Sequence, residues 1–340
     1  KGTRIVMQTK VIYEDSAFLE LADDWDELAR AGMTNTPFQT LKYQEIWWQN
    51  LRPDRAELVT VAAEDDGRAC AIGCFYVHDR QLHFNGCVEE SDYLDLICPP
   101  EQAEAAWTAV LDALCRLPSP AWDEMVLCNI PEASPTRDIL PRLTQERGLF
   151  FSQEQQEVCP VITLPGDFDA YLDSLGSRQR REIRRKFRRA AGAEAEMALI
   201  GPEDDLATAV NDFLDLLQKS TLEKRDWLTD GRRAVFHETA QAAMAENALQ
   251  LLFMEVEGKR AAALFNFDWN GRVWVYNSGL DPASFGSLSL GVVLTAKAIE
   301  KAIEDGRTEF DFLRGDEPYK YQFGAQDTRI YRLHISRNER

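Results

Sequence analysis

The sequence predicts an α/β protein, more closely an α+β one, with two similar halves that each hold a mixed, largely antiparallel sheet flanked by helices. Three observations support this prediction. The chain has 340 residues, which is long for a single hydrophobic core. Apolar runs of strand length alternate with longer segments whose apolar residues recur at helical spacing. One order of segments, namely helices, three strands, a helix and an apolar strand, occurs twice. We therefore expect one domain over residues 1–150 and a second over 151–340.

The elements of the first half can be placed in order from apolar spacing and turn residues. An opening strand is expected within residues 1–13 and a closing strand at 125–128. Asp66-Gly67 has the composition of a hairpin turn, and Pro99-Pro100 precedes a helix. The other predicted elements are helices at 18–31, 37–51 and 101–116 and strands at 58–63, 69–77 and 81–84.

The second half repeats this order with longer helices. A strand is expected at 157–163, and the sheet is expected to end with a strand at 330–335. The turn pairs Glu257-Gly258 and Asn270-Gly271 divide a meander of three strands. The other predicted elements are helical segments at 171–191, 202–219, 231–247 and 289–305 and strands at 249–255, 260–269, 273–276 and 310–313.

Composition and charge narrow the class of protein. The formal net charge of −19 argues against DNA binding and general nucleic-acid binding, and it favours a soluble, cytoplasmic protein. The sequence has no run of about 18 apolar residues, so no membrane span is expected. The four histidines are scattered, and none of the seven cysteines forms a C-x-x-C pair. This usage predicts buried free thiols and no metal site.

A glycine- and serine-containing loop at 284–289 precedes the helix expected at 289–305. Ser289 is suited to be the N-cap of that helix, and Gly306 is suited to be the C′ residue that ends it. Such a loop places free backbone N–H groups and the positive end of the helix dipole beside the end of a strand. This arrangement is suited to a phosphate or pyrophosphate, although the same loop can serve only as a helix cap.

The run from Phe310 to Gly324, FDFLRGDEPYKYQFG, closely resembles the closing motif of the BioF2-like (CelD-type) branch of the GNAT acyltransferase superfamily. This branch is related to the Fem peptidyltransferases of cell-wall synthesis. The resemblance is densest over residues 249–325 and extends more weakly over most of the chain, including the PFQT…WW pattern at 37–48. It implies two tandem GNAT-like domains and an acyltransferase that uses acetyl-CoA or another acyl-CoA as co-substrate.

The resemblance also implies where the donor binds. In GNAT folds a helix at the place of residues 289–305 receives the CoA pyrophosphate. Because the first half lacks a glycine loop, donor binding is expected in the second half. The loop departs from the GNAT signature Arg/Gln-x-x-Gly-x-Gly/Ala, which leaves CoA, another carrier and aminoacyl-tRNA open as donors. The candidate donor-binding residues are Gly286, Ser287, Leu288, Ser289, Gly291 and Arg314.

Two strands, at 273–276 and 310–313, are implied to part so that backbone N–H groups face the thioester. Asn277 and Ser278 interrupt an aromatic strand, which would suit a bulge lined with polar groups, or they mark the polar end of the strand. Asp311 is a carboxylate that could deprotonate the amine, or it pairs with Arg314 and shapes the turn. Asn277 and Asp311 are therefore catalytic candidates.

Tyr319 and Lys320 complete the candidate catalytic residues. The related Fem enzymes have a lysine in a similar Lys-x-x-Phe-Gly context, where it meets substrate phosphate or the reacting carbonyl. Residues 320–324 match that context. A lysine in an aromatic setting can also hold an anion simply as a point charge.

One segment departs from the acidic average of the chain. Residues 177–190 carry eight Arg or Lys and one Glu. As a helix they form a nearly all-round basic surface, with Ile183 and Phe187 as the apolar seam. Such a surface could contact CoA phosphates, tRNA or an anionic membrane surface, or it could balance acidic neighbours.

Together these features predict an acyl-CoA-dependent N- or O-acyltransferase whose acceptor is a sugar, an envelope precursor or an amino-acid-like amine. The first alternative is a Fem-type aminoacyl- or peptidyltransferase that uses charged tRNA. The looser glycine loop and the basic segment favour this alternative, and the acidic net charge does not. The second alternative is a catalytically silent GNAT-like module that binds a ligand or partner, because many functions share one fold. The sequence leaves the oligomeric state open.

Overall fold

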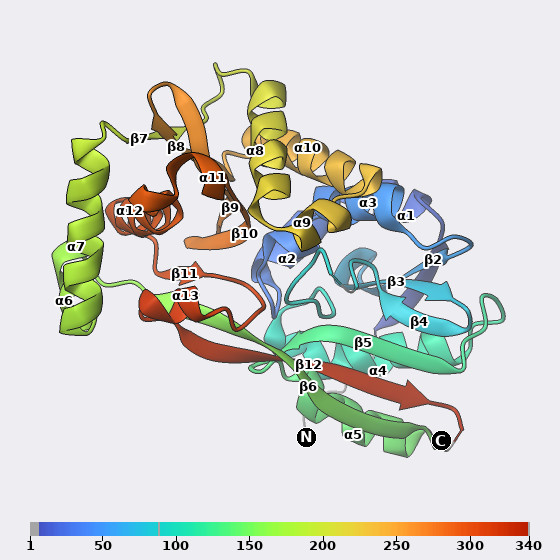
Figure 1. Cartoon of the computed structure of the whole chain (residues 1–340). Coiled ribbons are helices and arrows are strands. Elements are labelled where there is room, and N and C mark those ends of the chain that lie inside the picture. Colours follow the sequence, from blue (N-terminus) through green and yellow to red (C-terminus); the bar gives the residue numbers. More distant parts are fainter. Residues whose placement is uncertain (1–6, 88, 339–340) are drawn as a thin grey trace. The chain divides into compact units, whose positions relative to one another are not determined.

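A computed structural model describes residues 7–87 and 89–338 of the chain (Figure 1). Two compact units divide these residues. One runs to Val158 and resumes at Thr328, and the other is Cys159–Asp327. The expected division at residue 150 placed the whole C-terminal segment in the second domain. From Thr328 onward this segment instead belongs to the first unit, because Ile330 to Ser336 pair with a strand of that unit.

The first unit contains a largely antiparallel sheet in the order β1-β2-β3-β4-β5-β12-β6, in which β4 and β5 are parallel. Helix α2 packs against β3, and α4 packs against β1, β2 and β3. The strands are β1 (Gln8–Tyr13), β2 (Glu57–Asp65), β3 (Arg68–His78), β4 (Gln81–Phe84), β5 (Glu124–Pro131), β6 (Phe150–Thr163) and β12 (Gln326–Ser336). The helices are α1 (Ser16–Glu20), α2 (Ala22–Ala31), η1 (Pro37–Gln39), α3 (Leu41–Leu51), η2 (Pro100–Gln102), α4 (Ala103–Cys115) and α5 (Thr136–Glu146).

Local sequence signals predicted most of this unit. The hairpin at Asp66-Gly67 joins β2 to β3, and both residues have positive φ, +48° and +80°, as a two-residue turn requires. The helix expected at 18–31 is divided at Leu21, whose dihedral angles (φ −108°, ψ 6°) are not helical. The strand expected within residues 1–13 begins at Gln8, and residues 1–6 lie outside the described part of the chain.

The first unit also holds a disulfide that differs from expectation. Cys87 and Cys128 are bonded, with their Cα atoms 6.1 Å apart. Their side chains meet because β4 and β5 are neighbouring parallel strands, with Cys87 just after β4 and Cys128 within β5. The prediction of free thiols is therefore wrong for this pair. The other five cysteines are free: Cys70, Cys74, Cys98, Cys115 and Cys159.

The second unit contains a mixed sheet in the order β6-β11-β10-β9-β8-β7, in which β10 and β11 are parallel. Strand β6 enters this unit at Cys159. The other strands are β7 (Glu196–Leu199), β8 (Leu249–Val256), β9 (Lys259–Trp269), β10 (Arg272–Leu280) and β11 (Glu309–Asp311). The helices are α6 (Phe168–Ser174), α7 (Ser177–Gly192), α8 (Leu206–Ser220), α9 (Leu222–Trp227), α10 (Asp230–Ala245), α11 (Pro282–Phe285), η3 (Gly286–Leu288), α12 (Leu290–Glu304) and α13 (Pro318–Gln322).

Helices cover both faces of this second sheet (Figure 1). Leu264 of β9 belongs to the core that includes Leu294 of α12. The next residue, Phe265, packs against Phe213 of α8 and Phe236 of α10, with ring centroids 5.5 and 5.4 Å apart. Because consecutive strand residues point to opposite faces, α12 lies on one face and α8 and α10 lie on the other. Helix α7 packs against α12.

The second half departs from the predicted elements at several places. Strand β6 begins at Phe150, seven residues before the expected start at 157. The short helix α9 was not predicted, because six residues are too few to show a helical period. The segment expected as a loop at 284–289 contains the end of α11 and the single turn η3.

In the described part of the chain, no helix is long and apolar enough to cross a membrane. The same residues include no cluster of three or more His, Cys, Asp or Glu side chains that could hold a metal ion.

The buried carboxyl group of Asp95 joins the segment between β4 and η2 to the start of α5 in the first unit. Asp95 is 1% exposed and accepts hydrogen bonds from Thr136 Oγ1 (2.7 Å), from Ser134 Oγ and from the N–H of Leu96 (2.7 Å). Burial raises the pKa of Asp95 to about 6 even though these bonds oppose the rise. The folded state therefore binds a proton that the unfolded state has released over the interval from about pH 4 to about pH 6.

We expect this group to make the protein less stable as pH rises through that interval, by about 3 kcal/mol in total. In Asp95→Asn the free energy of unfolding should fall less between pH 4 and pH 6 than in the parent protein. Urea titrations at several pH values measure this difference. Parallel pH profiles for the two proteins would contradict the prediction.

Candidate active site

Strands β10 and β11 run side by side for only three residue pairs. Arg272 pairs with Glu309, Val273 with Phe310, and Trp274 with Asp311. Strand β11 ends at Asp311, whereas β10 continues to Leu280. The two strands therefore stop pairing after Trp274, as the sequence analysis expected for the strands at 273–276 and 310–313.

Strand β10 contains a bulge just beyond this point. Its register with β9 shifts between Val275 and Asn277, so Tyr276 is an extra residue in the strand. The Asn277 side chain lies within the bulge, and its Oδ1 accepts the N–H of Ser278 at 2.9 Å. The predicted bulge is confirmed, and Asn277 shapes its backbone.

A cavity of about 250 Å³ borders the parted strands. It extends from the bulge in β10 to η3 and the first turns of α12, and the segment after β11 closes another side. The cavity brings together the predicted residues Gly286, Ser289, Gly291 and Tyr319. It is lined by Ala263, Leu264, Val275, Ser278, Gly279, Leu280, Phe285, Gly286, Ser289, Leu290, Gly291, Val292, Leu294, Thr295, Phe312 and Tyr319.

The loop before α12 has the backbone form of an anion site. Ser289 is left-handed (φ 55°, ψ 43°) and follows the helical turn η3. A right-handed residue followed by a left-handed one turns successive N–H groups toward one point. A Cβ atom added at Gly286 or Gly291 would meet no heavy atom within 4 Å, so the backbone is open to a ligand.

The caps of α12 were predicted in part. Ser289 is the N-cap residue of α12 as predicted, but its backbone is left-handed and its side chain makes no cap bond. Its carbonyl instead accepts the N–H of Val292 at 3.0 Å. Gly306 does end the helix, with φ +71° and its N–H bonded to the Ile303 carbonyl at 2.9 Å.

Two other predicted donor-binding residues lie beside the cavity without lining it. Leu288 packs against the core that contains α12. The carbonyl of Ser287 accepts a hydrogen bond from Arg189 Nη1 of α7 at 2.8 Å. Helix α7 is thereby attached to the loop that precedes α12.

Lys320 occupies a different environment from the expected one. It is 3% exposed, and its Nζ donates to the carbonyls of Arg314 (2.9 Å) and Gly315 (3.0 Å) and lies 2.8 Å from the Glu317 carboxylate. It also donates to the Leu313 carbonyl at 3.3 Å. In this structure the ammonium therefore holds the 313–317 loop, and any contact with a phosphate or oxyanion stays a prediction.

The remaining catalytic candidates surround the same loop. Asp311 is buried, and its Oδ1 accepts the N–H of Leu313 at 2.7 Å, so the carboxylate shapes the turn after β11. Tyr319 lies on the cavity wall with its ring edge-on to Phe312 at 6.0 Å. Burial, with a smaller contribution from Glu317, raises the pKa of Tyr319. The Tyr319 phenol therefore keeps its proton at neutral pH.

Sequence analysis missed Lys224, which reaches the bulge from α9. Its Nζ donates to the Ser278 carbonyl at 2.7 Å and to Asn277 Oδ1 at 3.0 Å. At Gly279, just beyond the bulge, an added Cβ would lie 2.7 Å from the backbone nitrogen of Leu217, so only glycine fits there. No local sequence pattern marks Lys224, because α9 is one short helix between two long ones.

The basic helix predicted at 177–190 is α7. Ile183 and Ala190 are its buried residues, and Phe187 packs against the same core. Arg178, Arg181 and Arg188 are exposed and share one side of the helix, since their positions differ by 3 and 10 residues. Other arginines of α7 pair with acidic side chains: Arg180 with Asp173, Arg184 with Asp169, and Arg185 with Glu182.

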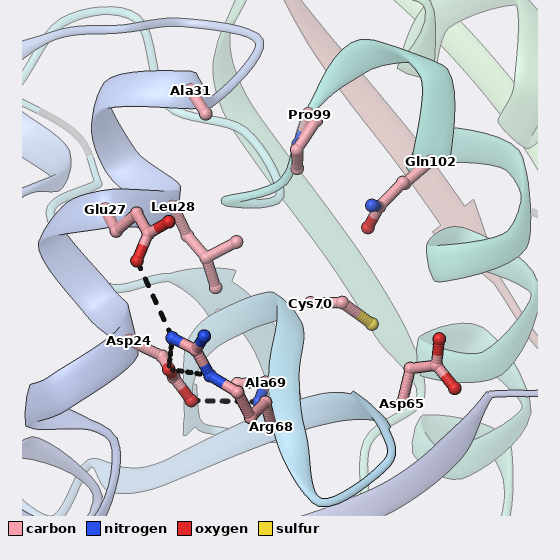
Figure 2. Close-up of a pocket in the computed structure, with 10 residues that line it drawn as sticks. All are labelled: Asp24, Glu27, Leu28, Ala31, Asp65, Arg68, Ala69, Cys70, Pro99 and Gln102. Carbon is pink, nitrogen blue, oxygen red and sulfur yellow. Dashed lines mark hydrogen bonds and ion pairs between the residues drawn. The ribbon is translucent and has the colours of Figure 1, made fainter.

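The first unit has a pocket of its own, about 270 Å³ in volume (Figure 2). Arg68 lies at its wall with Nη2 2.7 Å from Asp24 Oδ1 and 3.6 Å from Glu27 Oε2. Asp24 Oδ2 also accepts the N–H of Ala69 at 3.0 Å. These charged groups are already paired with one another, so the cavity beside β10 and α12 is the stronger candidate site.

Comparisons with known proteins agree with this geometry. Residues 177–321 match the family model described as an acetyltransferase (GNAT) domain. This segment includes the bulge, the loop before α12 and Lys320. No match is found among curated proteins.

Several solved structures share the fold at low sequence identity. FemX has a TM-score of 0.67 at 10% identity, over 91% of this chain and 95% of that chain. The C-terminal domain of a putative lysylphosphatidylglycerol synthetase from Agrobacterium fabrum has a TM-score of 0.59 at 9% identity, over 94% and 92%. A tandem GNAT protein from the clavulanic acid biosynthesis pathway has a TM-score of 0.53 at 10% identity, over 98% and 100%.

The parted strands, the bulge and the family match define the chain as an acyltransferase. More particularly, its residues 177–321 match an acetyltransferase (GNAT) domain, and the chain as a whole is similar in fold to FemX. The predicted superfamily, the tandem GNAT-like fold and the transferase class are thus confirmed.

The role of Lys320 in stabilising the 313–317 loop can be tested by substitution. Replacing it by Met leaves three carbonyls and the Glu317 carboxylate without their shared partner, so Lys320→Met should lower the free energy of unfolding by about 3 kcal/mol. The exposed Lys259→Met serves as the matched control and should change it by less than about 0.5 kcal/mol. Urea unfolding of both variants measures the effect. Equal stability of the two would show that Lys320 does not hold the loop.

Proposed function

We propose that the chain transfers an acetyl or longer acyl group from acyl-CoA to an amine or hydroxyl, in the manner of the BioF2-like (CelD-type) branch. The acceptor in this proposal is a sugar, an envelope precursor or an amino-acid-like compound. One observation carries the proposal: a single cavity connects the bulge of β10 with the open backbone at the start of α12. An acyl-CoA needs both the bulge and the open backbone, because its thioester and its pyrophosphate must be bound at the same time.

Each part of the donor has a matching surface. The pyrophosphate suits the N–H groups around Ser289 and the positive end of the α12 dipole. The acyl chain and the arm beside it suit the apolar walls formed by Leu264, Val275 and Leu294. The thioester would then lie at the bulge, where backbone N–H groups can stabilise charge that develops on its oxygen.

Proposed roles for the other residues follow from their positions. The phenol of Tyr319 keeps its proton and lines the cavity, so it can protonate the leaving thiolate. Asn277 and Asp311 set the backbone on the two sides of the opening. Lys320 is a positioning residue, since it holds the 313–317 loop that leads into α13, the helix that carries Tyr319. Arg314 and Ser287 would border the donor phosphates.

The proposal includes a cytoplasmic location. Five free cysteines among the described residues favour a reducing compartment, and the Cys87–Cys128 bridge does not.

A Fem-type transferase that uses charged tRNA is the second candidate. The observation that favours it is the exposed arginine row of α7, Arg178, Arg181 and Arg188, on a helix attached to the donor loop through Arg189. Among the described residues these three guanidinium groups have no acidic partner, and such a row suits a polyanion longer than CoA.

Aspartate substitutions in the loop test the first candidate. Gly286→Asp and Gly291→Asp place negative charge where the pyrophosphate would approach, so each should weaken CoA binding by about tenfold or more. Gly286→Ala and Gly291→Ala are the matched controls, because a Cβ meets no neighbour at either position. Isothermal titration with acetyl-CoA, longer acyl-CoAs and free CoA measures the effect. A parent protein that binds none of these, or Asp variants that bind as the parent does, would contradict the donor assignment.

The arginine row is tested by salt dependence. If it contacts a polyanion, the double variant Arg181→Gln/Arg188→Gln should bind tRNA more weakly, and the slope of log affinity against log salt should fall by about two. The double variant Arg55→Gln/Lys259→Gln removes the same charge elsewhere and should leave the slope unchanged. Fluorescence titration with tRNA at several salt concentrations measures the slope. Absence of tRNA binding by the parent, or equal slopes for the two variants, would exclude this role for α7.

A further inference from the structure

Lys224 lies at the edge of the active site, yet no function proposed so far uses it. It belongs to the first turn of α9, where its own N–H is bonded to the capping Thr221 Oγ1 at 3.1 Å. Its side chain reaches β10, and Nζ donates to the Ser278 carbonyl (2.7 Å), to Asn277 Oδ1 (3.0 Å) and to Ser278 Oγ (3.4 Å). The amine therefore meets both polar residues of the bulge.

Ser278 connects this amine with the cavity. The serine lines the cavity that would hold the thioester, and its hydroxyl also lies within hydrogen-bond distance of Lys224 Nζ. A hydroxyl both donates and accepts a hydrogen bond. It can therefore take a proton from a group in the cavity while it passes its own proton to the amine behind it.

The charges around Lys224 allow it to exist as a neutral amine. Burial lowers the pKa of Lys224 to about 8, and the nearby Lys320 ammonium acts in the same direction. The carboxylates of Glu317 and Glu223 act in the opposite direction with smaller effect. About a tenth of the Lys224 side chains are then unprotonated at pH 7.

Other groups at the site are less suited to accept a proton. Asp311 Oδ1 is bonded to the N–H of Leu313, at the turn after β11. The Lys320 ammonium is held by three carbonyls and by Glu317. Tyr319 keeps its proton because burial raises its pKa. Lys224 remains as a group that can become neutral and that reaches the cavity through one hydroxyl.

We propose that Lys224 accepts the proton of the attacking nucleophile, relayed through the hydroxyl of Ser278. The inference rests on the proposed function. The acceptor nitrogen or oxygen forms a bond to the thioester carbon while its proton passes to Ser278 Oγ and the serine proton passes to Lys224 Nζ. The carbon–sulfur bond then breaks and the thiolate takes a proton from Tyr319. Lys224 afterwards releases its proton to water, and the Tyr319 phenolate regains a proton from water, so both groups return to their starting states.

Direct titration of Lys224 tests the proposal without knowledge of the acceptor. Reductive methylation with ¹³C-formaldehyde gives each lysine an NMR signal that follows its protonation, and the loss of one signal in Lys224→Arg assigns it. A titration midpoint near pH 8 for the Lys224 signal supports the proton relay through Ser278. A midpoint near the ordinary lysine value of about 10.5 overturns it. The exposed Lys259 supplies a control signal for the effect of methylation itself.

Kinetics distinguish proton transfer from a structural role. Thiol release from acetyl-CoA, with methoxyamine as a probe nucleophile that stays unprotonated over this pH range, should rise with pH and level off near pH 8 in the parent protein. Lys224→Met should lower the rate about 10²- to 10³-fold and remove this inflection. Lys224→Arg keeps the donors to Ser278 and Asn277 but cannot accept a proton, so it should be equally slow. Full rescue by Arg overturns the proposal.

Two controls separate failure of this inference from failure of the proposed function. Lys219→Met removes an exposed lysine of the neighbouring α8 and should leave the pH profile unchanged. Each variant should unfold thermally at nearly the parent temperature and bind acetyl-CoA as the parent does. If the parent binds no acyl-CoA, the proposed function fails. If binding persists and Lys224→Met keeps the parent rate and inflection, only the relay fails.

Discussion

The parting of β10 and β11 is the constraint on which the second unit depends. Where two buried strands separate, their backbone groups lose their ladder partners and must find others. Lysine side chains supply them on both sides: Lys224 donates to the Ser278 carbonyl of β10, and Lys320 donates to the carbonyls of residues 313–315 after β11. The backbone carbonyls at the opening thus have hydrogen-bond partners. The cavity between the bulge and α12 exists because the strands part there.

The same constraint gives the two lysines different chemistry. Lys320 is almost fully buried, and a carboxylate, Glu317, lies 2.8 Å from its ammonium. Lys224 meets neutral oxygen atoms of Asn277 and Ser278, so burial dominates and lowers its pKa to about 8. A charged lysine suits the task of holding a loop, whereas a lysine that titrates near neutral pH suits proton transfer.

Low identity with the structural neighbours does not weaken the fold assignment, because the fold depends on patterns. Strand β9 needs apolar residues on both faces, with Leu264 toward α12 and Phe265 toward α8 and α10, and many apolar pairs satisfy this need. Particular residues are required only at close approaches, such as Gly279, where the backbone of α8 leaves no room for a Cβ. Neighbours with 9–13% identity can therefore keep the same architecture.

Local sequence by itself determined the features that depend on neighbouring residues. Periodicity located α12 and strands β8 to β10, Gly306 marked a helix end, and the polar pair after Tyr276 indicated the bulge. Only the tertiary structure decided which distant segments meet. The pairing of β12 with β5, the Cys87–Cys128 bridge and the reach of Lys224 to Ser278 join residues 41 or more positions apart. Such contacts leave no local period in the sequence, because they are selected by the packing free energy of the whole unit.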